Sequence, residues 1–320
     1  MFTIAQIGCG YWGPNLLRNF QNTEHCEVVA VADPSPSSRD KIQSLYPNLR
    51  LLETPDSLFT DPSIDGLVIA APARFHYELT KTAIESGKDV LVEKPLALTY
   101  SEGKELVELA FAKQRILMVG HILEYHPAIL KIQELLAGNQ LGKLQHLRST
   151  RLNLGKIRHE ENVLWSFAPH DIAIIQRLTG CQPTDIQVTT QTHLQEGIAD
   201  TVHADLKFSD NVHAHLHVSW LEPVKEQKLT VVGDQGMCTY DDVTKQLLLY
   251  PHHIDPTKTP PTSSKMEPRQ IPFHSLEPLA EECRAFLDAI RSRNSPLTDG
   301  QSALAVLHTL ETIQSLLVQD

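Results

Sequence analysis

The chain has 320 residues, of which 41% are hydrophobic and 21% charged, and its formal net charge is −11. This length suits two domains of ordinary size. A net acidic chain is also a poor candidate for general nucleic-acid binding, which needs clustered Lys and Arg. No apolar run reaches the ~20 residues that cross a membrane. Met1 leads directly into a predicted strand, so we expect no signal peptide and a cytoplasmic protein with reduced cysteines.

The first part of the chain alternates buried strands with amphipathic helices. The predicted strands are 2–7, 27–32, 64–71, 89–93 and 115–120. The predicted helices are 12–21, 39–45 and 75–86, followed by one that begins after Thr99, where Glu102 is placed for a capping box. This alternation indicates an α/β fold with a parallel, doubly wound sheet, and we assign residues 1–121 to a Rossmann dinucleotide-binding domain.

The pattern changes in residues 122–320, which we assign to an α+β domain for substrate binding and oligomerisation. Helices are predicted at 127–137 and 170–178, and two more, 277–291 and 300–317, end the chain. The predicted strands are 143–154, 184–193, 201–208, 212–220, 227–232, 237–241 and 246–250. A Pro-rich surface loop is expected over 256–268. We therefore expect a large, mostly antiparallel, open-faced sheet in this domain.

A glycine-rich turn connects the first strand to the first helix. Gly8, Gly10 and Gly13 fit a dinucleotide fingerprint, in a loop that also contains Tyr11 and Trp12. Asp33 ends the second strand, where a carboxylate can accept hydrogen bonds from ribose hydroxyls. This favours NAD over NADP, although Arg39 weakens the preference. The alternative role of Asp33 is to form the turn before Pro34.

The strands at 64–71 and 89–93 end in residues that would face the cofactor crevice. Glu93-Lys94-Pro95 follows the second of these strands, and Lys94 would lie beside the reacting carbon. Ala71-Pro72 ends the other strand, so its backbone could pack near the nicotinamide. We interpret His76 as a histidine at the start of a helix rather than as a catalytic group.

Three segments resemble the Gfo/Idh/MocA family of NAD(P)-dependent sugar oxidoreductases. They are the loop Gly8–Gly13, Ala71-Pro72 with His76, and Glu93-Lys94-Pro95. The resemblance implies a Rossmann domain and a second domain whose open sheet packs on another subunit of a homo-oligomer. It also implies a general base, because Ala168-Pro169-His170-Asp171-Ile172 matches the segment that carries the family's catalytic histidine.

Physical chemistry supports His170 as that base. In the first turn of a helix, the positive end of the dipole would disfavour imidazolium and keep a neutral base available. A helix-capping histidine is the alternative. Many relatives have an aspartate four residues earlier, where this chain has Ser166. Proton abstraction would then depend more heavily on His170 and Lys94.

A cationic segment precedes His170 in this otherwise acidic chain. It contains Arg148, Arg151, Lys156, Arg158 and His159. Guanidinium and ammonium groups pair with phosphate oxygens, so the segment suggests a clamp for the diphosphate of a nucleotide sugar. A solvated basic strand edge is the alternative.

The chain resembles one bacterial subgroup of the family more closely. The matching segments are 11–16, 151–156, 161–165 and 218–221. Members of this subgroup oxidise C3 of UDP-N-acetylglucosamine or its uronate and supply the keto sugar to an aminotransferase. The resemblance implies a UDP-sugar substrate, with a pocket that includes Tyr125, His126, Arg151, Asn153, Lys156, Arg158, Trp165 and His170.

The alternatives left open are the uronate, another nucleotide-sugar reaction or the reverse reaction, and a non-catalytic NAD-binding sensor. We expect no metal, because His213, His215 and His217 share one face of a strand and lack the closed geometry of a structural zinc site. If that face is buried between subunits, acidification should weaken assembly. Sedimentation at pH 7.5 and pH 5 tests this, and identical profiles would contradict it.

Overall fold

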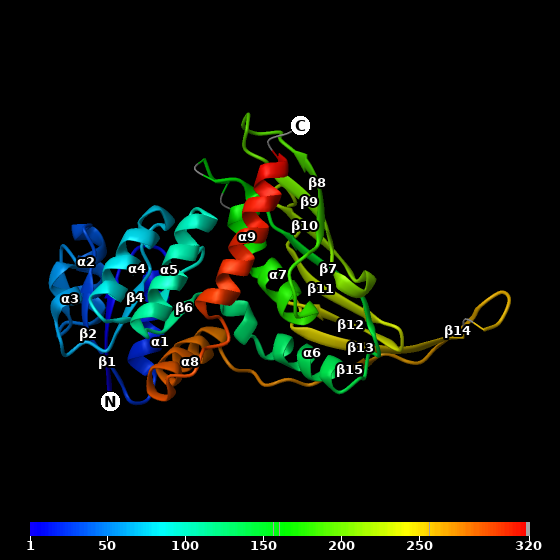
Figure 1. The fold of residues 1–320 in the computed structure, drawn as a ribbon, viewed down its shortest axis with the longest axis horizontal. Helices are drawn as coiled ribbons and strands as arrows, with labels where there is room; N and C mark the ends of the chain where they lie inside the picture. Colours follow the sequence, from blue (N-terminus) through cyan, green and yellow to red (C-terminus); the bar gives the residue numbers. More distant parts are fainter. Residues whose placement is uncertain (156, 160, 256, 318–320) are drawn as a thin grey trace. The chain divides into compact units, whose positions relative to one another are not determined.

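A computed structural model describes residues 1–155, 157–159, 161–255 and 257–317 (Figure 1). The chain forms two compact units. Unit 1 comprises Met1–Tyr125 and Leu276–Leu307, and unit 2 comprises His126–Ser275 and the chain from residue 308 onward. Residues 276–307 thus lie with the Rossmann unit, whereas the sequence analysis assigned them to the second domain.

Unit 1 contains a six-stranded parallel sheet with strand order β3-β2-β1-β4-β5-β6. Its strands are β1 (Phe2–Ile7), β2 (Cys26–Ala32), β3 (Arg50–Leu52), β4 (Gly66–Ile69), β5 (Asp89–Val92) and β6 (Leu117–Val119). Its helices are α1 (Gly13–Asn22), α2 (Pro36–Leu45), α3 (Asp56–Thr60), α4 (His76–Glu85), α5 (Tyr100–Lys113) and α8 (Pro278–Ser292), with 3-10 turns η1 (Ala73–Phe75) and η2 (Ile122–Tyr125). The predicted doubly wound sheet is confirmed. Its order reverses between β1 and β4, which is where such sheets bind ligands.

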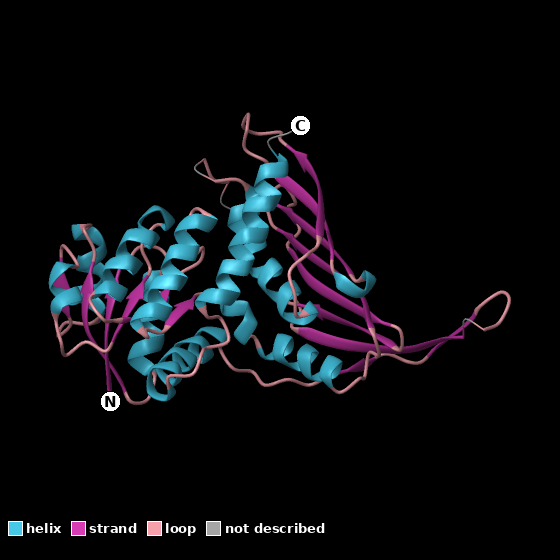
Figure 2. Ribbon diagram, in the orientation of Figure 1, coloured by secondary structure: helices cyan, strands magenta, loops and turns pink. Residues whose placement is uncertain are grey.

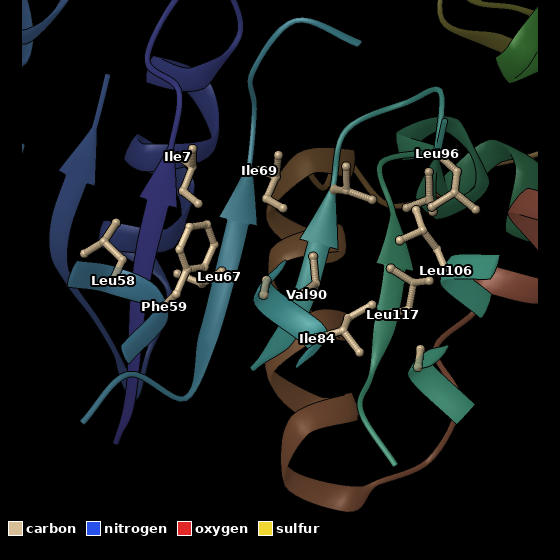
Figure 3. Packing of buried hydrophobic residues seen from close by; sticks show 14 of the residues in the cluster. Ile7, Leu58, Phe59, Leu67, Ile69, Ile84, Val90, Leu96, Leu106 and Leu117 are labelled. Carbon is tan, nitrogen blue, oxygen red and sulfur yellow. The ribbon is translucent and has the colours of Figure 1, made fainter. Parts of the chain in front are cut away.

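Each buried strand contributes to two cores, because successive side chains point to opposite faces of a sheet. One core, shown in Figure 3, includes Ile7, Leu67, Ile69, Val90, Leu58, Ile84 and Leu106. The other joins Ile4, Val68 and Leu91 to residues of α1 and α8. Within it, the rings of Phe20 and Phe286 meet edge to face with centroids 6.3 Å apart. This apolar packing explains why α8 belongs to unit 1.

Unit 2 contains a nine-stranded sheet (Figure 2). Its strands are β7 (Leu144–Leu152), β8 (Asp185–Gln191), β9 (Thr201–Lys207), β10 (His213–Ser219), β11 (Glu226–Gly233), β12 (Gly236–Asp241), β13 (Gln246–Asp255), β14 (Thr262–Lys265) and β15 (Arg269–Gln270). Their order is β14-β13-β12-β11-β7-β10-β9-β8, with β15 beside β13. Among the described strands of this second sheet, only β7 and β10 pair in parallel, so the predicted mostly antiparallel sheet is confirmed.

Helices α6 (Pro127–Ala137) and α7 (Val163–Thr179) belong to unit 2, and α9 (Gly300–Leu317) begins in unit 1 and ends in unit 2. Helix α7 contacts β7, β9 and β10. Strand β14 lies inside the segment 256–268 that was predicted to be a Pro-rich loop, and β15 directly follows that segment. In the described part of the chain, no helix combines the length and apolar character of a membrane span.

Candidate active site

The glycine loop of unit 1 is shaped by close backbone contacts at its two ends. Gly8 has φ +94°, and a Cβ there would lie 2.5 Å from the Ala70 carbonyl oxygen. A Cβ on Gly13 would lie 2.6 Å from the Gly8 carbonyl oxygen. A Cβ on Gly10 would meet no protein atom within 4 Å. The loop is therefore tightly packed at both ends and leaves open space at its centre for a ligand's pyrophosphate.

The first turn of α1 follows this loop directly. Trp12 occupies its N-cap position without a side-chain cap hydrogen bond. Backbone N–H groups at a helix start form a natural anion site. A cavity of about 460 Å³ lies beside the loop, lined by Cys9, Gly10, Tyr11, Pro14, Ser38, Lys41, Ile42, Ser44 and Leu45. These features fit a dinucleotide cofactor.

Asp33 holds the loop next to this cavity. Its Oδ2 accepts a hydrogen bond from the Cys9 backbone N–H at 2.7 Å, and its Oδ1 accepts one from Ser35 at 2.8 Å. The Arg39 guanidinium donates to the Asp33 carbonyl oxygen at 2.7 Å. Burial, with the neighbouring Asp33 carboxylate, raises the pKa of the Cys9 thiol to about 12. Asp33 thus organises the loop, and Arg39 is committed to the main chain behind it.

The Glu-Lys-Pro segment follows β5, and Lys94 in it is half-buried. The Glu93 carboxylate packs against Gly120, where a Cβ would lie 2.8 Å from Oε2. Burial raises the pKa of Glu93 to about 7, although the Lys94 charge and a hydrogen bond from Trp12 oppose that rise. The Trp12 contact links the glycine loop to the segment that carries Lys94.

His76 makes a second link at the same edge of the sheet. Its Nδ1 lies 2.7 Å from the Pro95 carbonyl oxygen and its Nε2 lies 2.8 Å from the Ala71 carbonyl oxygen. Burial lowers the pKa of this histidine, and a neutral ring has one N–H, so it donates a hydrogen bond to only one of these two carbonyl oxygens. His76 is the first residue of α4, and it ties together the segments that follow β4 and β5. Pro72 precedes η1 in the first of these segments.

Unit 1 also contains a buried acidic cluster, formed by Glu93, Glu124 and Glu282, that the sequence analysis did not predict. Glu124 is 3% exposed and Glu282 is fully buried, and neither carboxylate oxygen of Glu282 has a hydrogen-bond partner among the described residues. Burial, followed by the charges of Glu93 and Glu124, raises the pKa of Glu282 well above its ordinary value. The available signal was the position of Glu282 on the apolar face of α8, between Leu279 and Phe286.

In unit 2, the prediction that His170 lies in the first turn of its helix is wrong. Helix α7 begins at Val163 and is capped by Asn162, whose Oδ1 accepts from the Trp165 backbone N–H at 3.4 Å. His170 is therefore in the middle of α7, and the dipole argument fails because that effect decays within the first turn. The predicted helix began at residue 170, directly after Pro169, whereas this proline lies inside the observed helix. His170 itself is half-buried.

The cationic residues before α7 are not gathered into one group. The Arg151 Nε and Nη2 donate to Asp171 at 2.6 and 3.1 Å. Arg158 is 47% exposed at its side chain and pairs with Glu161 at 2.9 Å. Asn153 is half-buried and donates its backbone N–H to Ser219. Lys156 lies outside the described residues.

The remaining predicted pocket residues make contacts within their own units. In unit 1, the Tyr125 hydroxyl lies 3.3 Å from the Thr298 hydroxyl. In unit 2, the Trp165 Nε1 donates to Gln314 at 3.0 Å. His126 caps α6, since its Nδ1 accepts from the Ala128 backbone N–H at 3.1 Å. Their roles toward a substrate stay predictions.

The histidines of β9 and β10 lie on one face of the sheet of unit 2. The rings of His203 and His217 stack with centroids 4.0 Å apart. His215 pairs with Asp205 on the neighbouring strand. Within the described ranges, no group of three or more His, Cys, Asp or Glu side chains could hold a metal ion.

Comparison with known proteins identifies relatives that share this architecture. Residues 2–121 match the Gfo/Idh/MocA profile described as an oxidoreductase family with an NAD-binding Rossmann fold, and residues 129–239 match a C-terminal domain of the same family. The UDP-N-acetylglucosamine 3-dehydrogenase of Acidithiobacillus ferrooxidans is 23% identical over 304 residues, which are 94% of this chain and 92% of that protein. The 2,7-anhydro-N-acetylneuraminate hydratase of Mediterraneibacter gnavus is 26% identical over 253 residues, 74% of this chain and 66% of that protein.

Solved structures share the fold over nearly the whole chain. That of the A. ferrooxidans dehydrogenase has a TM-score of 0.86 at 21% identity and covers 98% of this chain and 97% of its own. An Agrobacterium radiobacter oxidoreductase, solved with NAD+, L-tartaric acid and magnesium, has a TM-score of 0.84 at 18% identity, with 99% and 96% covered. One of the two family matches lies in each unit. The chain therefore belongs to the Gfo/Idh/MocA family of oxidoreductases, with an NAD-binding Rossmann domain over residues 2–121.

Proposed function

We propose that this protein oxidises the C3 hydroxyl of UDP-N-acetylglucosamine to a 3-keto sugar, with NAD as the oxidant. The observation that carries the proposal is the similarity to the A. ferrooxidans dehydrogenase, which spans 94% of this chain. In unit 1, the open space at Gly10 and the Trp12 link to the Glu-Lys-Pro segment support it. These two features support a dinucleotide bound at the carboxyl edge of the sheet, with Lys94 beside it.

The proposed chemistry needs one base and one hydrogen-bond donor. His170 removes the proton of the 3-hydroxyl, and Lys94 donates a hydrogen bond to the same oxygen as it gains alkoxide character. Bound NAD supplies the acceptor for the hydride that leaves C3. Asp33 keeps the glycine loop in place for the cofactor through its bond to the Cys9 amide.

The diphosphate of the substrate needs cations that are free to reach it. Of the cations predicted for this role, Arg158 is 47% exposed at its side chain and pairs with Glu161 at the surface, whereas the guanidinium of Arg151 is largely buried against Asp171. We therefore propose Arg158 as a diphosphate contact, and the role of Lys156 expected from the sequence stays a prediction because this residue lies outside the described residues. The 3-keto product suits an aminotransferase that builds a 2,3-diamino sugar, such as those of lipid A. We further propose a cytoplasmic homo-oligomer assembled through the sheet of unit 2.

NADH formation at 340 nm tests the substrate. Purified protein is mixed with NAD and UDP-N-acetylglucosamine, and separately with the corresponding uronate. A sugar aminotransferase and glutamate are included, because oxidation at C3 can be uphill and need removal of its product. Signal with the neutral sugar supports the proposal. Signal with the uronate alone moves the function to that substrate, and NAD binding without turnover favours a sensor.

The residue roles have their own test. Lys94→Met and His170→Asn should each lower turnover by about 10²-fold or more while NAD binding is retained. The measurements are kcat in the same assay and NAD affinity by calorimetry. Near-normal turnover in both variants contradicts the assignment of the two residues.

A further inference from the structure

A continuous polar network lies in unit 2, on the face of the sheet that α7 covers. Ser149 and Arg151 are two residues apart on β7, so their side chains share one face. Both reach the same carboxylate: the Ser149 hydroxyl donates to Asp171 Oδ1 at 2.6 Å, and the Arg151 Nε donates to Asp171 Oδ2 at 2.6 Å. Asp171 is 2% exposed and directly follows His170 in α7.

The network continues from Arg151 across the sheet. Gln227 is paired with Arg151 on the neighbouring strand β11. With its amide oriented by its neighbours, Gln227 accepts from the Arg151 Nη1 at 3.2 Å and donates to Asp242 Oδ2 at 2.9 Å. All three nitrogens of the guanidinium are thus used by protein groups, which leaves this fork unsuited to binding a diphosphate.

Further charged groups complete the surroundings of the pair. Asp242 also accepts hydrogen bonds from Lys245 and the Tyr240 hydroxyl, both at 2.6 Å. The Nδ1 of His126 is an acceptor, so its Nε2 carries the proton and donates to Tyr240 at 3.0 Å. Burial alone would lower the pKa of Arg151, but the charge and hydrogen bonds of Asp171 outweigh it and raise that pKa. The Arg151 guanidinium therefore stays charged and is held in a fixed position against Asp171.

The turn of α7 that carries His170 needs such an anchor. Pro169 lies inside the helix and has no N–H, so it removes one backbone hydrogen bond of this turn. An interior proline disfavours a helix by about 3 kcal/mol and commonly bends it. Two side chains of β7 hold the residue that follows His170, and they hold it by three hydrogen bonds. Side-chain bonds to the sheet thus hold the helix next to the place where this backbone hydrogen bond is missing.

We propose that Arg151 and Asp171 are positioning residues that fix the proline-weakened turn of α7 and set the orientation and charge environment of His170. The inference rests on the proposed function, in which His170 is the base. It gives Arg151 a different task from the diphosphate clamp expected from the sequence. The pair is neutral overall, so removing one member leaves a single charge beside the residue that must accept the proton.

The test compares variants whose charge effects have opposite signs. His170 must be neutral to accept a proton, so its protonation sets the acid limb of kcat/KM against pH. Arg151→Met leaves the Asp171 carboxylate, which favours imidazolium, and should move the acid limb upward by about 0.5 to 1 unit. Asp171→Asn leaves the Arg151 cation and should move the limb downward by about the same amount. If the two substitutions only damaged the fold, the acid limb would not shift in opposite directions in the two variants.

Arg151→Lys separates geometry from charge. Lys keeps the positive charge but not the fork that holds both carboxylate oxygens. The acid limb should therefore stay in place while kcat falls by about tenfold. The control is Arg293→Met, which breaks a similar fork to Asp89 (2.6 and 3.2 Å) in unit 1 and should leave the limb unmoved.

A second readout does not depend on turnover. The protonation of His170 is followed by NMR in protein labelled at histidine ring carbons, with its signal assigned by its loss in His170→Asn. If the wild type shows no turnover on any UDP-sugar, the proposed function is refuted. The NMR titration still tests the positioning role in that case. Opposite shifts of the His170 titration in Arg151→Met and Asp171→Asn support the inference, and unchanged or parallel shifts overturn it.

Discussion

Replacing Glu282 by Gln should stabilise the protein increasingly as pH rises. Its carboxyl is fully buried in unit 1, and its pKa is raised well above 4.5 by burial and by the charges of Glu93 and Glu124. Such a group keeps its proton in the folded protein, whereas the unfolded chain releases it above about pH 4.5. Its contribution to stability is therefore complete below that pH and is lost progressively as pH rises toward the raised folded value.

The magnitude follows from linkage. One proton retained only in the folded state costs about 1.4 kcal/mol of unfolding free energy per pH unit. Between pH 5 and pH 7, a carboxyl that keeps its proton in the folded protein throughout would remove at most about 3 kcal/mol from the unfolding free energy of the wild type. Gln has the same shape and no ionisation, so the variant should be close to wild type at pH 5 and more stable by up to this amount at pH 7.

Urea unfolding followed by circular dichroism at pH 5, 6 and 7 measures the difference. Glu281→Gln is the matched control: it is the same substitution on the same helix, at a partly exposed residue whose carboxylate pairs with Arg284 at 2.6 Å. The control should show no growing advantage with pH. A difference between Glu282→Gln and wild type that stays constant from pH 5 to pH 7 would refute the buried-proton reasoning.

Two further predictions concern unit 1. Gly10→Ala should weaken NAD binding by about tenfold or more with the fold retained, because its Cβ enters open space, whereas Gly13→Ala should also lower the melting temperature because its Cβ would meet the Gly8 carbonyl oxygen. Calorimetric titration with NAD and thermal unfolding distinguish the two outcomes. Thr99→Ala removes a capping box formed with Glu102 and should cost about 1 kcal/mol in urea unfolding, and an unchanged midpoint would contradict this.

Much of unit 1 could be predicted because its signals are local. The glycine loop, the strand that ends at Lys94 and the capping box at Thr99 each depend on residues a few positions apart. Strand β3 and helix α3 were missed because three and five residues are too few to show a periodicity. The position of α8 in unit 1 was missed because it depends on packing with α1, more than 250 residues away in the chain.

The start of α7 shows how a strong local signal can mislead. The helix was predicted over 170–178, directly after Pro169, and a proline is common in the first turn of a helix. Asn162 is a better start, since its side chain caps the helix and seven residues of α7 precede His170. The proline is tolerated in the interior because tertiary contacts hold this turn, and those contacts come from β7, which the sequence alone does not bring next to α7.

The alternation of side chains along a strand could have shown, from the sequence alone, that the cationic segment does not form one group. Side chains of β7 alternate between two faces, so Arg148 and Arg151, three residues apart, must point in opposite directions. The structure agrees: Arg148 is exposed, whereas Arg151 lies on the covered face with Ser149 and is bound to Asp171. The geometry of a strand by itself therefore excludes a single clamp formed by both arginines. What the alternation could not supply was the buried carboxylate, because Asp171 lies on another element, and it is this carboxylate that makes Arg151 a support for His170.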